Sequence, residues 1–299
     1  MNVPIWFILF AHTIYFVYWP RIEVNTQNRA IIQMEKYAHI FSLGYRCSSA
    51  GILKSLGLKQ ESYPFDWLVS RLPIIEHCVK TDFSEFLNVA NYTKRKSATY
   101  GYPTADPNSR QWICDESIRV NHYYEFAAQD NHLYLVPYLT PTHDAYSHRM
   151  MMNHHDITQE KDREYYVRCV DRWNRMFESP GRKLSLYIHP VIFKEYYDIC
   201  KDALHKDLRR FHRELNATKH DGIYIIPVKT SYDDPTNHCA KYVLEEQPDD
   251  DLTPNCRICV LWTNNKFIDA GEIFMGKCFV ETYVIKEYVW NAASSGRLA

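Results

Sequence analysis

The apolar residues from residue 38 onward follow two periods, and together they predict a mixed series of strands and helices. Continuous apolar runs predict short buried strands, whereas apolar residues three or four apart predict helices. The strands we expect are residues 38–43, 132–139, 183–188, 222–228, 258–262 and 278–285. The helices we expect are residues 49–56, a second that begins at Pro73, 159–178 and 194–215. This order allows an α+β fold or a doubly wound α/β sheet, and the pattern alone does not choose between them.

The N-terminal stretch differs from the rest of the chain because residues 1–20 carry no charged side chain. A helix of that length rises about 30 Å, enough to cross a bilayer. We therefore expect residues 1–37 to be a hydrophobic anchor or signal segment with a tether, and residues 38–299 to form a single domain. A membrane-anchored or secretory-pathway protein would follow, with its orientation left open.

Composition and charge exclude several classes of function. A chain of 299 residues with 46% apolar residues can bury a sizeable core. Its formal net charge of −1 and the absence of a long Lys/Arg block give no reason to expect nucleic acid as a partner. The nine cysteines are an odd number spread through a long chain, which is not the pattern of a compact disulfide scaffold.

No cofactor or metal is predicted from the motifs present. The chain has neither a G-x-G-x-x-G nor a Walker pattern. Cys256 and Cys259 form a C-x-x-C pair, but residues three apart on one strand face opposite sides, so only a turn could let both bind one ion. The histidines and aspartates between His143 and Asp156 could also bind a divalent metal, although their spacing does not match H-E-x-x-H.

The stretch FSLGYRCSSAGILKSLGL, residues 41–58, places Cys47 at a bend between an expected strand and an expected helix. Ser48 or Ser49 can cap that helix, and Gly57 can end it in a left-handed conformation. A thiol just before a helix lies near unpaired N–H groups and the positive end of the helix dipole, which favour the thiolate. The alternative is a buried structural cysteine, because cysteine is among the most buried residue types.

Several motifs resemble one known family. SLGYRC followed by AGILKSLGL, then SYPFDWLVS and FSEFL, is similar to the opening signature of an uncharacterised family of papain-like cysteine peptidases from bacteria and large DNA viruses. NHHDI before the helix EYYVRCVDRWNRMFES is a second similarity. The resemblance implies a papain-like α+β fold with Cys47 as the nucleophile and His155 as its general base. The implied substrate is a peptide, amide or other acyl group.

A third catalytic group is harder to assign. Asp156 follows His155 directly, and neighbours in a chain often point apart. Asp66, in PFDW, could direct its carboxylate toward the site, or it could cap a helix. The backbone N–H of Cys47 could contribute to an oxyanion hole.

Two other functions stay open. An anchor before a catalytic domain is also the plan of many lumenal glycosyltransferases, in which SLGYRC would be a turn near a donor phosphate and Arg172 or Arg175 would neutralise it. The third possibility is a non-catalytic binding module in which Cys47 is structural.

Overall fold

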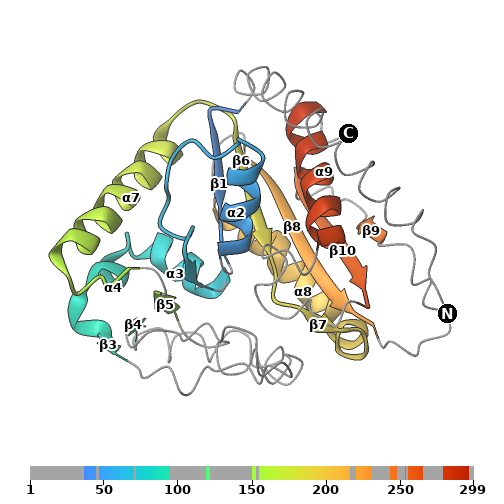
Figure 1. The fold of residues 1–299 in the computed structure, drawn as a ribbon, viewed down its shortest axis with the longest axis horizontal. Helices are drawn as coiled ribbons and strands as arrows, with labels where there is room; N and C mark the ends of the chain where they lie inside the picture. The colour runs from blue at the N-terminus through green and yellow to red at the C-terminus, as the bar shows by residue number, and fades with distance from the viewer. Residues whose placement is uncertain are drawn as a thin grey trace, which may run out of the picture.

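The structure is a computed structural model, and the description below covers the following residues: 37–44, 47–70, 72–94, 119–121, 150–152, 155–215, 220–230, 243–247, 253, 255–264 and 279–295. Within these ranges, long helices cover both faces of a main sheet, and a smaller sheet accompanies it (Figure 1).

The main sheet is built mostly of parallel strands. Its path runs in the order β1-β6-β8-β10-β9, with β7 paired to β8. All pairs are parallel except β10 with β9. The strands are β1 (His39–Ser42), β6 (Lys183–Ile188), β7 (Ile192–Phe193), β8 (His220–Lys229), β9 (Val243–Glu246) and β10 (Cys256–Thr263). Every residue of β6 is buried, as expected for a parallel strand covered on both sides.

Each face of the main sheet packs against its own pair of helices. Helices α7 (Glu160–Glu178) and α8 (Lys194–Glu214) cover what we call the first face. Helices α2 (Cys47–Ser55) and α9 (Phe279–Ser295) cover the second face. Successive residues of β8 divide between the two cores, with Tyr224 in the first and Ile225 in the second, because side chains alternate along a strand.

The smaller sheet is antiparallel and has the strand order β2-β5-β4-β3. Short helical elements accompany it in the chain segment after α2. Its strands are β2 (Leu68–Val69), β3 (Tyr92–Lys94), β4 (Arg119–Asn121) and β5 (Met150–Met152), and the helical elements are α3 (Leu72–Lys80), α4 (Ser84–Leu87) and η1 (Val89–Asn91).

Trp173 fixes α7 against both β1 and the PFDW turn. Its ring lies 5.4 Å from that of Phe41 and 5.3 Å from that of Phe65, both in edge-on contacts. Phe83, just before α4, adds a third edge-on contact at 6.0 Å. Buried aromatic pairs of this kind stabilise by about 1 kcal/mol beyond the area they bury, so Trp173 organises the first-face core.

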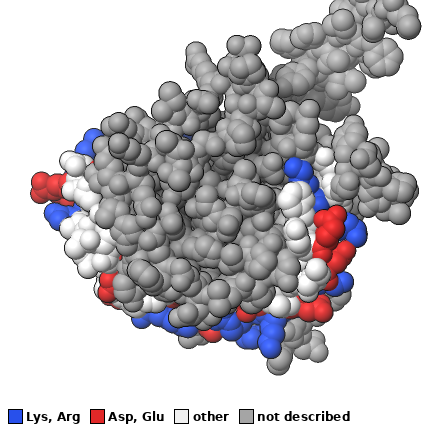
Figure 2. Space-filling view, turned by 90° about the horizontal axis from the view of Figure 1, so that it is seen from below, with Lys and Arg blue, Asp and Glu red and all other residues white. Residues whose placement is uncertain are grey.

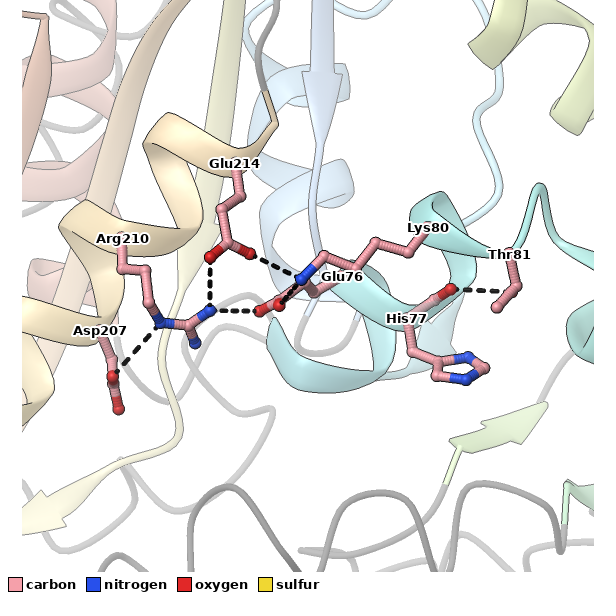
Figure 3. A network of polar contacts seen from close by, with 7 residues as sticks. All are labelled: Glu76, His77, Lys80, Thr81, Asp207, Arg210 and Glu214. Carbon is pink, nitrogen blue, oxygen red and sulfur yellow. Dashed lines mark hydrogen bonds and ion pairs between the residues drawn. The ribbon is translucent and has the colours of Figure 1, made fainter.

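A network of charges joins α3 to α8 at the surface (Figure 3). Glu76 and Glu214 each accept from both Lys80 and Arg210, at distances between 2.5 and 3.0 Å. Asp207 lies 3.7 Å from the Arg210 guanidinium. These side chains are partly exposed, so solvent screens the network and each pair stabilises only weakly.

Most of the predicted elements are confirmed, with ends shifted by a few residues. The strands predicted at 38–43, 183–188, 222–228 and 258–262 are β1, β6, β8 and β10, and the four predicted helices are α2, α3, α7 and α8. Residues 278–285 were predicted as a strand, and this is wrong, because α9 begins at Phe279. The strand predicted at 132–139 lies outside the described residues.

The observed fold has features of both fold classes predicted from the sequence. The chain mixes helices with sheet, which is compatible with the α+β expectation. The parallel main sheet with helices on both faces is the arrangement named as the alternative. A papain-like architecture stays a prediction.

The anchor and tether were predicted over residues 1–37. Residues 1–36 lie outside the described residues, and Tyr37 is the first that the structure describes. Among the helices of the described part, none combines the length and the apolar character needed to cross a membrane.

The described Lys, Arg, Asp and Glu side chains visible in Figure 2 lie around the edge of that view with both signs interspersed.

Candidate active site

The bend after β1 is held by two hydrogen bonds between Gly44 and serine side chains. The N–H of Gly44 donates to Ser42 Oγ at 3.2 Å, and Ser49 Oγ donates to the Gly44 carbonyl at 2.5 Å. Gly44 has a φ of +87°, and a Cβ atom there would lie 2.7 Å from Ser70 Oγ. Both the left-handed backbone and the close approach of Ser70 therefore require glycine at this position.

Cys47 is the first residue of α2 and is half-buried. The first-turn N–H groups of a helix have no intrahelical acceptor, and the helix dipole favours negative charge there. The first turn of α2 contains no acidic residue that would oppose this effect. The predicted capping by Ser48 or Ser49 is wrong, because α2 begins at Cys47 and the Ser49 hydroxyl donates to Gly44 instead.

Three other cysteine thiols have environments that oppose ionisation. Burial raises the pKa of the Cys169 thiol, that of Cys200 to about 11 and that of Cys259 to about 12.

The two cysteines of the C-x-x-C pair belong to different cores, Cys256 to the first-face core and Cys259 to the second-face core. The two C-x-x-C thiols thus lie on opposite faces of β10, as residues three apart on a strand do, and cannot bind one ion together. Across the described residues, no group of three or more potential ligands is placed to hold a metal.

His155 lies between β5 and α7 and is partly exposed. Its ring stacks on Tyr165 with centroids 4.5 Å apart and meets the edge of Tyr166 at 5.7 Å. Its Nδ1 lies 3.3 Å from Asp162 Oδ1. Asp162 can therefore orient the ring, which is the role of a carboxylate beside a catalytic imidazole.

Asp156 does not direct its carboxylate at the His155 ring. Its Oδ1 accepts from the backbone N–H of Thr158 at 3.1 Å and from the Thr158 hydroxyl at 2.6 Å. Its own N–H donates to Asp162 Oδ2 at 2.7 Å. The carboxylate near His155 is thus that of Asp162, which the sequence analysis missed. The signal available was an acidic residue in the first turn of the helix that follows His155.

Asp66 is fully buried in the PFDW turn. Its Oδ2 lies 2.7 Å from Lys59 Nζ and accepts from the Tyr63 N–H at 2.8 Å. Burial raises its pKa to about 6, although Lys59, the Tyr63 N–H and Arg172 all act to lower it. The predicted capping role is wrong, because Leu68–Val69 is a strand and the next helix begins at Leu72. Oδ1 of Asp66 has no hydrogen-bond partner within the described part.

The structure brings some of the predicted residues together and not others. His155 and Asp156 share Asp162 as a partner. The recorded contacts of the His155 ring, within the described residues, are to Asp162, Tyr165 and Tyr166. In Figure 1 the start of α7 lies beside α4 at the left edge, whereas α2 lies against β1 and β6 at one end of the main sheet. The pairing of Cys47 with His155 therefore stays a prediction.

One histidine that the sequence analysis did not consider lies close to the end of β1. His189 directly follows β6, the strand that pairs with β1. It is 7% exposed, and its backbone N–H donates to the Ile225 carbonyl at 2.7 Å. Its position immediately after a predicted buried strand was the available signal, because functional residues gather at the carboxyl ends of parallel strands.

Comparisons with known proteins bear on this site. A family model described as "Putative papain-like cysteine peptidase" matches residues 38–195, more than half of the chain. An uncharacterized protein of Acanthamoeba polyphaga mimivirus is 28% identical over 144 residues, which cover 48% of this chain and 57% of the viral protein. The match thus spans little more than half of that relative. No solved structure matches the chain. The region matched by the family model includes Cys47, Asp66, His155, Asp162 and His189.

Proposed function

Because the chain belongs to the family whose model matches residues 38–195, we propose that it is a cysteine hydrolase or acyltransferase with Cys47 as the nucleophile. The observation that carries the proposal is the position of Cys47. It is the first residue of α2, half-buried, at the carboxyl end of a strand in a parallel sheet. Ligands of open parallel sheets bind outside the carboxyl ends of the strands.

The chemistry needs a thiolate and a place for the developing negative charge. The thiolate attacks the acyl carbon, and the carbonyl oxygen becomes an oxyanion that N–H groups in the first turn of α2 can stabilise. Collapse of this intermediate leaves a thioester on Cys47 and releases the amine or alcohol, which takes up a proton. Water or a second acceptor then attacks the thioester, so the same site serves a hydrolase or an acyltransferase.

The general base predicted from the family resemblance is His155. What supports it is the Asp162 carboxylate, 3.3 Å from Nδ1, which is suited to orienting the ring so that Nε2 can take the proton. Asp66 and Asp156 have other partners, Lys59 and Thr158, so we assign the orienting carboxylate to Asp162.

Acyl transfer to Cys47 can be tested with an activated ester. A nitrophenyl ester is incubated with the native protein, and peptide mass mapping locates the acyl group. We expect a thioester on Cys47 that forms and decays, and no nitrophenolate release above background in Cys47→Ser. Cys169 and Cys200 are internal controls because both thiols are buried with raised pKa values. Acylation spread evenly over the cysteines, or none at Cys47, would contradict the proposal.

The second candidate is a glycosyltransferase-like enzyme, and the parallel main sheet with helices on both faces favours it. Arg172, considered above for a donor phosphate, donates instead to the Ser62 carbonyl at 2.8 Å. Uridine or guanosine diphosphate should raise the melting temperature by an amount that grows with its concentration if a nucleotide site exists. No shift at saturating concentrations, with or without Mg²⁺ or Mn²⁺, would exclude these nucleotides as ligands. If, in addition, Cys47 is not acylated in the ester assay, the results would favour the third possibility, a non-catalytic binding module in which Cys47 is structural.

A further inference from the structure

The chain leaves the adjacent strands β1 and β6 toward opposite faces of the main sheet. β1 pairs with β6 in parallel, and Ser42 lies opposite Leu186. After β1 the chain enters α2, which packs on the second face, and after β6 it proceeds to α8, which packs on the first. A ligand is expected where the connections of neighbouring parallel strands diverge in this way. We call this place the β1/β6 switch point and define it by Gly44, Cys47 and His189.

The hydrogen bonding of His189 determines which ring nitrogen carries the proton. Its Nδ1 lies 2.7 Å from the carbonyl oxygen of Pro190. A carbonyl oxygen can only accept, so Nδ1 must be the protonated nitrogen, and Nε2 of the neutral ring carries the lone pair. The ring also contacts Tyr187 edge-on at 6.1 Å. His189 is therefore held as the tautomer that a general base needs.

Ser70 supplies an independent sign of a ligand at the same bend. Its side chain is fully buried, and Ser70 Oγ has no hydrogen-bond partner in the described part of the chain. The oxygen lies 2.7 Å from the position that a Cβ atom on Gly44 would occupy. A buried hydroxyl without a partner is costly, and a polar group of a ligand would remove that cost. Ser70 Oγ is thus available to bond a polar group of a ligand at the bend that precedes Cys47.

We propose that His189 is the catalytic base of Cys47 and that the acyl group of the substrate binds at the β1/β6 switch point, beside the Ser70 hydroxyl. The proposal rests on the function proposed above for Cys47, and it replaces His155 with His189 as the general base of that site. Nε2 of His189 takes the thiol proton, and the resulting imidazolium stays bonded to the Pro190 carbonyl through Nδ1. The thiolate forms the bond to the acyl carbon, and the imidazolium returns its proton to the leaving amine or alcohol.

Two positional facts favour His189 over His155 in this role. His189 follows the strand that is hydrogen-bonded to β1, and the ladder between the two strands continues to Leu43, whose N–H donates to the Leu186 carbonyl at 3.0 Å. The ring of His155 instead contacts Asp162 and Tyr165 of α7.

The test follows the thiolate of Cys47 by its ultraviolet absorbance during a pH titration. Wild type should show a step below about pH 8, the range of activated thiols, and Cys47→Ser should lack it. His189→Asn keeps a donor in the place of Nδ1 and removes Nε2. It should move the step upward by about one to three pH units, the effect of losing a neighbouring cation. His155→Asn and Ser70→Ala should leave the step in place.

The outcomes separate the two proposals. A step that shifts in His155→Asn and not in His189→Asn would overturn the role of His189 and leave Cys47 as the nucleophile. Absence of any Cys47 step below about pH 8 in wild type would overturn the proposed function itself. If His189→Asn does not fold, ¹⁵N NMR of the His189 ring replaces it. The ring should be cationic in wild type near neutral pH and neutral in Cys47→Ser, and a ring that is neutral in both would contradict the proposal.

Discussion

Ser49 and Gly44 are joined by a hydrogen bond of 2.5 Å from the Ser49 hydroxyl to the Gly44 carbonyl. The bond links the first turn of α2 to the bend that follows β1, and Cys47 lies between the two residues in the chain. Since both residues are buried, the direction in which Cys47 enters its helix depends on this contact.

Gly44→Ala should destabilise the protein by about 3 kcal/mol, because a left-handed backbone and a close contact with Ser70 Oγ both oppose a Cβ atom. Gly57→Ala is the matched control, since Gly57 has a φ of +69° but is exposed. It should cost only about 1 kcal/mol, from backbone strain alone. Urea unfolding of both variants checks the difference, and equal losses would contradict the bend described above.

Two buried histidines should make the fold less stable in acid. Burial lowers the pKa of His205 to about 4 and that of His212 to about 4. Because these folded-state values lie below the unfolded value of 6.5, the unfolded state binds more protons between the two, and stability is lost as the pH falls. The free energy of unfolding should decrease by about 2 kcal/mol per histidine between about pH 6.5 and pH 5.

His205→Gln and His212→Asn test this dependence without removing the hydrogen bond of either ring. Gln can replace Nε2 of His205 beside the Tyr197 hydroxyl, and Asn can replace Nδ1 of His212 beside that of Tyr224. Each variant should show a smaller change in unfolding free energy from about pH 6.5 to pH 5 than wild type. Asp66 acts in the opposite sense, because its pKa is raised to about 6 and its contribution is lost as the pH rises through that value. If the unfolding free energy of both variants changes with pH as much as that of wild type, His205 and His212 are not the cause of the acid destabilisation.

The buried pair of Lys59 and Asp66 should matter more than the surface network of Figure 3. Asp66→Ala leaves the Lys59 ammonium, whose side chain is only 6% exposed, without its carboxylate, and should cost about 3 kcal/mol. Arg210→Ala removes one member of the exposed network and should cost less than about 1 kcal/mol. Thermal unfolding with and without added salt checks both, and only the network should respond to salt. A greater loss of stability in Arg210→Ala than in Asp66→Ala would contradict the prediction that the buried pair matters more than the surface network.

Local patterns in the sequence predicted much of this fold, and the segment that was predicted wrongly shows the limit of such patterns. Buried strands such as Lys183–Ile188 and amphipathic helices such as Glu160–Glu178 have clear periods. Residues 278–285 are rich in β-branched and aromatic residues, yet α9 forms because Ile285, Val289 and Ala293 recur at helical spacing and bury on the second face. Of these three residues only Ile285 belongs to the segment predicted as a strand, so the helical spacing becomes visible only beyond that segment.

The sequence predicted those features of the candidate site that depend on neighbouring residues in the chain. It did not predict the contacts between segments that are distant in the sequence. The strand, glycine, cysteine and helix order placed Cys47 correctly at a helix start. The carboxylate of Asp162 beside His155 depends on how the chain enters α7, and the proximity of His189 to β1 depends on the pairing of β1 with β6. Neither pairing is encoded in a local period, so a single sequence does not reveal them.

The measurement that tests the central claim most directly is the pH dependence of iodoacetamide labelling at Cys47 in the native protein, quantified by peptide mass mapping. A nucleophile activated by a helix end and an imidazole should label rapidly well below about pH 8, while Cys169 and Cys200 in the same sample stay unmodified. Labelling of Cys47 that rises only above about pH 8.5, the behaviour of an ordinary thiol, would contradict its assignment as the catalytic nucleophile.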